Sequence, residues 1–205
     1  MSAGGKRSGR RGRLCLLALL TSAAGAGWYA AARTEARPAP FRRAWWYWHH
    51  PFRLSSDEAA RLRGAGCERL YVHAGDLAAR GGTLILTRPQ RFESTPPCDL
   101  FLVLRVHPAA HDLLLGPAGA KEVAARLAAL PAPAGVSGVQ LDADVPTARL
   151  AEYARMLSTL RELLPQPWEL SITALPDWLR SPDYPKLCAS VHEIAPQFYG
   201  NLWPR

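Results

Sequence analysis

The chain has 205 residues, of which 48% are hydrophobic, and a formal net charge of +8. This length is enough to bury one substantial core and leaves no room for two large domains. Nine basic residues and one acidic residue precede Ala44, so the remaining 16 of the chain's 25 basic and 16 of its 17 acidic residues cancel. Because the basic excess is confined to this short N-terminal stretch, the composition disfavours a phosphate-tracking surface and therefore nucleic-acid binding.

The N-terminal stretch is typical of an export segment. Residues 1–13 form a basic region, and residues 14–32 are 19 consecutive uncharged positions rich in leucine, alanine and glycine. This run fits a signal peptide, with alanines at 30–32 as a cleavage site, or a hydrophobic helix that stays as a membrane anchor. Either alternative predicts a periplasmic or extracellular protein that contacts the membrane only through an uncleaved segment. Residues 33–43 are expected to be a linker to one domain over residues 44–205.

Beyond the linker, the sequence predicts strands alternating with helices. A tryptophan-rich strand over 44–50 precedes a Ser55–Glu58 capping box, which opens a short helix with an expected buried apolar stripe. Helical spacing of apolar residues predicts two more helices, over 118–130 and 147–164. Further strands are expected over 68–74, 100–106, 137–144, 168–174 and 193–199, with an extra strand or hairpin arm over 83–87.

Strands separated by helices favour a parallel α/β fold, either doubly wound or TIM-barrel-like. A complete barrel takes about 250 residues, so the chain predicts a (β/α) barrel with about six of its eight βα units, incomplete or truncated. Pro196 lies in the last expected strand and favours an edge position or a bulge over a central position for it. No glycine-rich phosphate loop follows the first strand, and we expect no cofactor.

Residues 137–144, with the sequence SGVQLDAD, carry the candidate chemistry. Side chains alternate along a strand, which places Gln140, Asp142 and Asp144 on one face. Two neighbouring carboxylates repel each other and lose solvation, so the pKa of one should rise, as a general acid requires. We predict that Asp144 is the acid and that Asp142 orients it. The alternative is structural: Asp144 caps the following helix and Asp142 pairs with an arginine.

Aromatic rings near strand ends are candidates for stacking on sugar rings, with packing in the core as the alternative. These residues are Trp45, Trp46, Tyr47, Trp48, Trp178 and Trp203. We take Trp46, Trp48 and Trp178 as substrate-binding.

Histidines and cysteines suggest two further hypotheses. Four histidines near strand ends, His49, His50, His107 and His111, suggest a metal-assisted hydrolase or deacetylase if they meet the two aspartates. No zinc-type spacing supports a metal, so we expect none and assign His50 to substrate binding. Cys67 and Cys98 precede consecutive strands, which leaves open a disulfide between them or buried thiols, Cys188 included.

Three segments carry a family resemblance: SGVQLDAD, ITALPDW and PQFYG. Together they resemble an uncharacterised family of exported bacterial proteins, with a domain of unknown function related to glycosidase-type TIM barrels, over roughly residues 45–200. A more distant similarity is to chitinase-type (family-eighteen) glycoside hydrolases, whose fourth strand reads DGxDxDxE. Asp144 then stands in the place of the general-acid glutamate and Asp142 in that of the last aspartate. Ser137 and Gln140 replace the other two acids, which is a departure from that pattern.

The resemblance extends to Gln197 and Tyr199, which are similar to a sixth-strand pair that contacts the N-acetyl group of the sugar. The resemblance to the uncharacterised family implies a TIM-barrel fold. With the more distant similarity to chitinase-type enzymes, we predict an exported, glycoside-hydrolase-like protein, expected to be a monomer, that acts on or binds a polysaccharide or oligosaccharide. Asp144, Asp142 and Tyr199 would be catalytic, and Gln140 and Gln197 would bind substrate with the aromatic residues and His50. A non-catalytic carbohydrate-binding barrel is the alternative, beside the metal-assisted hydrolase.

Overall fold

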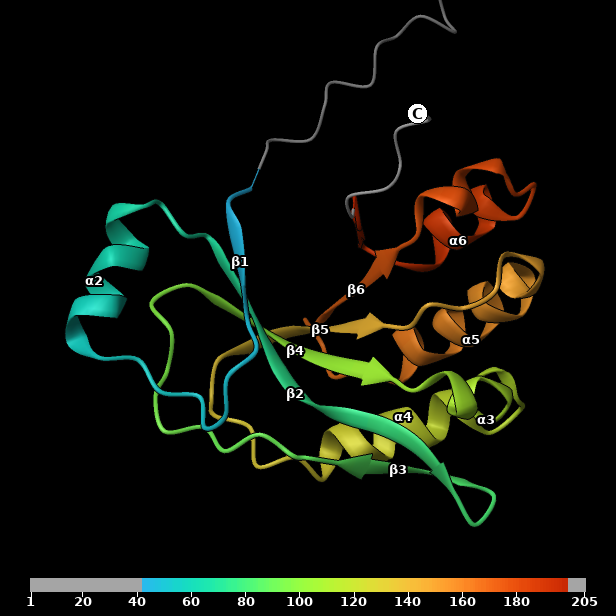
Figure 1. Ribbon diagram of the computed structural model, residues 1–205, viewed down its shortest axis with the longest axis horizontal. Coiled ribbons are helices and arrows are strands. Elements are labelled where there is room, and N and C mark those ends of the chain that lie inside the picture. Colours follow the sequence, from blue (N-terminus) through green and yellow to red (C-terminus); the bar gives the residue numbers. More distant parts are fainter. Residues whose placement is uncertain (1–41, 199–205) are drawn as a thin grey trace, which may run out of the picture. The chain divides into compact units, whose positions relative to one another are not determined.

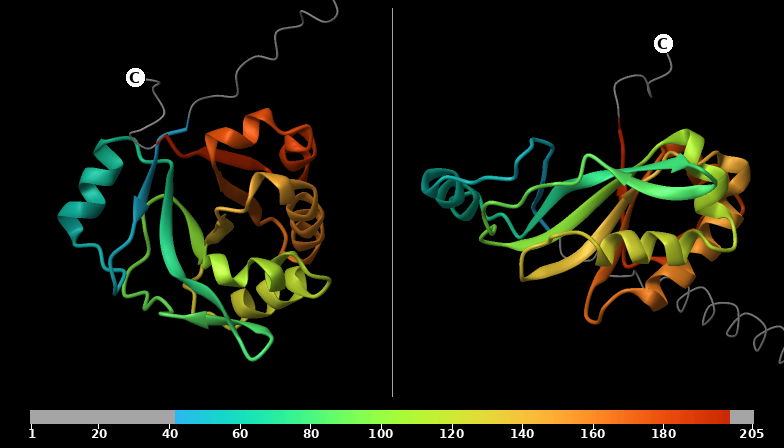
Figure 2. Two further views of the ribbon diagram at one scale, coloured as in Figure 1. Left: turned by 45° about the vertical axis from the view of Figure 1, so that its right-hand side comes forward. Right: turned by 90° about the horizontal axis from the view of Figure 1, so that it is seen from below.

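The computed structural model describes residues 42–198 (Figure 1). The predictions for the basic region, the hydrophobic segment over residues 14–32, most of the linker and Tyr199 lie outside this range. Within it, none of the helices has the length and apolar character that crossing a membrane requires. The described residues form an α/β unit whose main helices cover one face of a curled sheet (Figure 2).

Six parallel strands of the described chain form a curled half-barrel, consistent with a partial TIM-like barrel. In sheet order the strands are β1 (Ala44–Tyr47), β2 (Arg69–Arg80), β4 (Asp99–Val106), β5 (Val136–Asp142), β6 (Glu169–Ala174) and β7 (Glu193–Pro196). β3 (Thr83–Thr87) pairs antiparallel with the second half of β2 and is the predicted hairpin arm. Pro196 lies in β7, which ends this order, so the expected edge position is confirmed among the described strands.

The helices α3, α4, α5 and α6 lie together on the convex side of the sheet (Figure 1). The helices of the described chain are α2 (Ser56–Gly64), α3 (His111–Leu115), α4 (Gly119–Ala128), α5 (Leu150–Leu163) and α6 (Tyr184–Ser190). Short 3₁₀ turns at Pro108–Ala110, Thr147–Arg149 and Pro176–Arg180 connect strands to helices. The two long predicted helices are confirmed as α4 and α5, whereas α3 and α6 are too short to show a helical period.

Helix α2 confirms one prediction and corrects another. The Ser55 hydroxyl accepts a hydrogen bond from the Glu58 amide, and the Glu58 carboxylate accepts one from the Ser55 amide, which completes the capping box. The expected buried stripe is wrong, because no residue of α2 is buried. The helix stands beside β1, at the end of the described sheet, and no helical layer covers it there (Figure 1).

The convex face of the sheet packs against the helices and forms the larger core. Side chains alternate along each strand, so every second residue enters this core. From the strands these include Leu70, Val72, Leu102, Leu104, Val139, Leu141, Leu170 and Ile172, and from the helices Val123, Leu127, Leu157 and Leu160. Burying each such side chain contributes about 1.5–3 kcal/mol, and this apolar layer leaves the concave face for polar groups.

On the concave face, a layer around Arg69 closes the amino-terminal end of the half-barrel. The Arg69 side chain is 2% exposed and lies over the Phe101 ring, with 3.8 Å from the guanidinium carbon to the ring centre. It donates hydrogen bonds to Glu169, at 2.7 Å, and to Glu193. Burial and then the hydrogen bond from its hydroxyl to Glu193 raise the pKa of Tyr71 to about 12. These contacts connect β2 with β6 and β7 across the concave face and help hold the sheet in its curl.

Cys67 and Cys98 are neighbours, as their places before consecutive strands indicated. Their sulfur atoms lie 3.2 Å apart as free thiols. Burial, followed by the contact with Cys67, raises the pKa of Cys98 to about 12. Cys188 is exposed, so a buried thiol at that position is not found.

Candidate functional site

Asp142 and Asp144 lie at the carboxyl end of β5, on the concave side. Asp142 is the last residue of the strand and is half-buried, whereas Asp144 follows it and is exposed. Both line an open cavity of about 250 Å³, together with Arg105, Val106, His107 and Pro108. The alternation along the strand therefore brings the two carboxylates to one cavity at the rim of the sheet, where βα enzymes place their chemistry.

Hydrogen bonds from two neighbouring segments hold the Asp142 carboxylate. Its Oδ1 accepts from the Thr173 hydroxyl on β6 at 2.8 Å and from the Gln197 amide just after β7 at 2.9 Å. Because these donors come from different segments, the orientation of Asp142 depends on the curl of the sheet. Gln197 thus reaches the site by contacting Asp142, and its contact with a sugar stays a prediction. The predicted sixth-strand partner, Tyr199, lies outside the described residues.

The structural alternative for the two aspartates does not hold. Among residues 42–198, neither Asp142 nor Asp144 forms an ion pair. The 3₁₀ turn that follows, Thr147–Arg149, is preceded by Pro146 and has no side-chain cap. Both carboxylates therefore lie at the cavity, and neither is used in an ion pair or a helix cap within the described residues.

Partial burial and then repulsion from Asp142 raise the pKa of Asp144 above its ordinary value, and the nearby His111 lowers it by a smaller amount. This direction agrees with the sequence-based expectation that one carboxyl of the pair would hold its proton more tightly. His111 itself is 7% exposed, and its Nε2 has no hydrogen-bond partner among the described residues. Burial, followed by the charge of Arg149, lowers the pKa of His111, so this ring is neutral at pH 7.

Gln140 lies on β5, two residues before Asp142. The residue is fully buried; its Oε1 accepts from the Trp46 indole at 2.9 Å, and its Nε2 donates to the Ser171 hydroxyl at 3.0 Å. Trp46 also stacks on Tyr71, with 4.7 Å between ring centres, and remains 43% exposed. Gln140 therefore acts by holding Trp46 in place, and the Trp46 ring is the surface that a ligand can reach.

Trp178 does not belong to this surface. Its side chain is fully buried, its indole nitrogen donates to the Val145 carbonyl at 3.0 Å, and its ring packs edge-on against Tyr153. The expectation that it stacks on a substrate is not met, because the turn after β6 directs the ring into the convex core. Trp48, by contrast, is 44% exposed and lies over His73 near the rim, with 4.9 Å between ring centres.

His50 belongs to a second polar cluster that sequence reasoning missed. Its Nε2 lies 2.8 Å from Nδ1 of His73, and Nε2 of His73 lies 3.0 Å from Oδ1 of Asp76. Arg105 donates from Nε to the same Asp76 oxygen at 3.0 Å. The sequence predicted that the second strand ends at Ala74, whereas β2 continues to Arg80 and carries Asp76 within it.

A β-bulge in β2 places the Asp76 side chain on the concave face of the sheet. The pairing of β2 with β4 shifts between His73 and Gly75, so that both His73 and Asp76 face the concave side. An extra residue in one strand has this effect, because it reverses the alternation beyond it. Gly75, at φ +152°, was the one signal in the sequence, a glycine inside a strand pattern.

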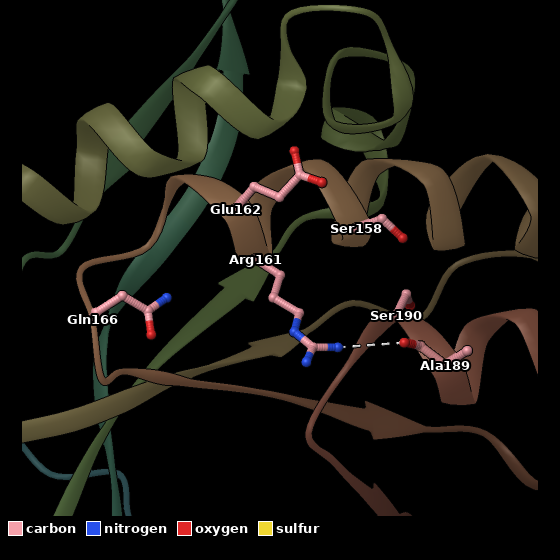
Figure 3. Close-up of a pocket in the computed structure, with 6 residues that line it drawn as sticks. All are labelled: Ser158, Arg161, Glu162, Gln166, Ala189 and Ser190. Atoms are coloured by element: carbon pink, nitrogen blue, oxygen red, sulfur yellow. Dashed lines mark hydrogen bonds between the residues drawn. The ribbon is translucent and has the colours of Figure 1, made fainter.

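The histidines named in the metal hypothesis do not gather. Among residues 42–198, no group of three or more histidine, cysteine, aspartate or glutamate residues is arranged to hold a metal ion. A separate hollow of about 380 Å³ lies between the ends of α5 and α6 (Figure 3). It is lined by Ser158, Arg161, Glu162, Gln166, Ala189 and Ser190. These residues come before β6 and β7 in the chain. The hollow is therefore at the amino-terminal end of the strands, opposite the carboxyl end that carries the aspartates.

A family model described as "Domain of unknown function (DUF3142)" matches residues 112–205, a stretch that contains Asp142 and Asp144. No curated protein matches the chain significantly. Among solved structures, the crystal structure of the Bacillus cereus spore cortex-lytic enzyme SleL is similar, with a TM-score of 0.54 and 16% sequence identity. The similarity covers 81% of this chain and 43% of that one, so the chain spans less than half the length of the enzyme. At this identity the likeness concerns the fold.

Proposed function

We propose that this chain is an exported, glycoside-hydrolase-like protein that hydrolyses a polysaccharide with Asp144 as the general acid. The observation that carries the proposal is the shared cavity at the end of β5, with Asp142 held by Thr173 and Gln197 and the pKa of Asp144 raised. The fold likeness to a cortex-lytic enzyme supports the choice of a cell-wall polysaccharide as the first substrate to test. Export would depend on residues 14–32.

In the proposed reaction, the protonated Asp144 gives its proton to the glycosidic oxygen. The bond between the sugar carbon and this oxygen breaks, and its electron pair stays on the oxygen. A water molecule then gives its hydroxyl to the sugar carbon and its remaining proton to a base. Asp142, fixed by two hydrogen bonds, lies next to Asp144, and its charge raises the pKa of that acid. Trp46 and Trp48 are exposed on the same side and would stack on sugar rings, and Tyr199 would complete the sugar contacts.

Asp144→Asn tests the acid. We expect turnover to fall by about 10²- to 10⁴-fold while glycan binding persists, because asparagine keeps the shape but carries no transferable proton. The measurement is the release of reducing ends from purified bacterial peptidoglycan and from a panel of soluble polysaccharides. Asp57→Asn on α2 is the control, since Asp57 is exposed and belongs to no part of the site.

The pH profile provides a second readout of the same residue. The acid must carry its proton, so wild-type activity should decrease as the pH rises through the elevated pKa of Asp144. An Asp144→Asn protein with wild-type turnover would contradict the proposal.

A non-catalytic carbohydrate-binding barrel is the second candidate, because Trp46 and Trp48 are both exposed. In that case wild-type protein would bind glycans, release no reducing ends, and be unaffected by Asp144→Asn. If neither protein binds any member of a glycan array, both candidate functions fail.

A further inference from the structure

We propose that His50 is a proton-accepting catalytic residue of this site, and that His73 and Asp76 are positioning residues that set its tautomer. The group it would deprotonate is a hydroxyl, from a sugar or from water, lying against the exposed ring of Trp48. This inference deepens the proposed function and rests on it for the substrate. Its structural basis is the hydrogen-bonded line from His50 through His73 to Asp76.

The tautomers of His73 and His50 follow from the hydrogen bond between His73 and the buried Asp76. Asp76 is 1% exposed, and a carboxylate only accepts hydrogen bonds, so both His73 Nε2 and Arg105 Nε donate to its Oδ1. In a neutral His73 ring, Nδ1 therefore carries the lone pair and accepts a hydrogen bond from Nε2 of His50. This leaves Nδ1 of His50 as an unprotonated nitrogen on an exposed side chain.

A buried amide fixes the two histidines relative to each other. Gln90 is 1% exposed, and its Nε2 donates to the His49 carbonyl at 3.0 Å and to the His73 carbonyl at 2.9 Å. Its Oε1 accepts from the Phe52 amide at 3.0 Å. Gln90 therefore connects the chain before and after His50 to β2. These contacts fix the position of the His50 ring, and a proton-transfer group requires a fixed position.

Partial burial, more than the surrounding charges, favours the neutral form of His50. Burial, His73 and Arg88 lower its pKa, and Asp76 raises it by a smaller amount. Arg88 approaches Asp76 to 3.7 Å, and its backbone lies at φ 50°, a region that non-glycine residues seldom adopt. Arg105 holds the other side of Asp76. The neutral ring is the form that accepts a proton.

The His50 line is continuous with the aspartate cavity. Asp76, Arg105 and Asp142 are paired in register across β2, β4 and β5, and neighbouring strands are about 4.8 Å apart. Arg105 both donates to Asp76 and lines the cavity of Asp142 and Asp144. Arg105 thus connects the Asp76 end of the His50 line with the cavity that Asp142 and Asp144 line.

The proposed step is a single proton transfer. The proton of the hydroxyl moves to Nδ1 of His50, and the electron pair of the O–H bond remains on oxygen, which becomes nucleophilic. The positive charge on the His50 ring is stabilised through His73 by the Asp76 carboxylate. In hydrolysis the hydroxyl is that of the attacking water.

The first test needs no substrate. Nitrogen-15 NMR of the histidine rings in the full chain should show neutral His50 protonated at Nε2, and Asp76→Asn should alter this preference. Diethyl pyrocarbonate should modify His50 at pH 7 in wild-type protein. His49 is the matched comparison, because it is adjacent and exposed and its side chain makes no hydrogen bond within the described residues. A ring protonated at Nδ1, or Zn²⁺ bound stoichiometrically by wild type and lost in His50→Gln, would overturn the inference.

The second test uses the reducing-end assay on peptidoglycan. His50→Gln should reduce kcat by at least about 100-fold, change KM little and remove the acidic limb of the pH profile, while His49→Gln should have no effect. Asp76→Asn should shift that limb instead of removing it. His50→Gln with normal kcat would overturn the role of His50 and leave Asp144 as acid untouched. A wild-type protein without turnover on any polysaccharide would refute the hydrolase, and the catalytic role of His50 with it.

Discussion

Gly75→Ala is the sharpest test of how the fold builds the site. Gly75 lies at φ +152°, and a Cβ added there would be 2.8 Å from Cδ1 of Leu86 and 3.0 Å from the carbonyl oxygen of Thr87. Backbone strain at such a position costs about 1–3 kcal/mol, and overpacking against β3 adds about 1–3 kcal/mol. We therefore expect the free energy of unfolding to decrease by about 2–6 kcal/mol.

Gly81→Ala is the matched control for this substitution. Gly81 also has a positive φ, +58°, but a Cβ there would have nothing within 4 Å. Its cost should be the backbone term alone, about 1–2 kcal/mol.

The assay is urea unfolding followed by tryptophan fluorescence, with the His73 ring observed by NMR in the same proteins. A strand that relieves the clash by losing its bulge turns Asp76 to the other face of the sheet, because a slip of one residue reverses the alternation. Gly75→Ala should then lose the hydrogen bond between His73 and Asp76 as well as stability. Equal costs for the two alanine variants, with that hydrogen bond intact, would refute the reasoning.

Two further predictions concern the parts of the domain away from the carboxyl rim. Arg69→Leu should lower the free energy of unfolding by about 3 kcal/mol, the lower end of the range for breaking a buried ion pair, because Glu193 is 33% exposed and recovers some hydration. Urea unfolding measures this change, and a decrease below about 1 kcal/mol would contradict the prediction. Mild oxidation should form a disulfide between Cys67 and Cys98, whose sulfur atoms lie 3.2 Å apart. The two residues are 31 positions apart in the sequence, so closing this loop should raise the free energy of unfolding by about 3–4 kcal/mol. Thiol counting and thermal unfolding test this second prediction, with Cys67→Ser as control, and two titratable thiols after oxidation would contradict it.

Local patterns were sufficient to place the six parallel strands and the helices α4 and α5, and to place the two aspartates of the site. Strand alternation places Asp142 and Asp144 on the same side at the end of β5, and the Ser55–Glu58 capping box begins α2 as expected. These features depend on residues close in sequence, whose geometry follows from the strand or helix they belong to. The raised pKa of Asp144 also follows, since its two leading causes are partial burial and a neighbour two positions away.

Tertiary structure alone decided the rest of the site, which is the cluster of His50, His73 and Asp76 and the exclusion of Trp178. A bulge opposite β4 turns Asp76 to the concave side, where it meets His73 and, through it, His50. Whether Trp178 faces the cavity or the core depends on the turn after β6 and on space beside Tyr153, and it enters the core. Sequence period describes one strand at a time, whereas these contacts depend on the register and curl of several strands. The amino-acid sequence by itself therefore determined the strand with its pair of acids, and only the packed sheet decided which distant side chains surround them.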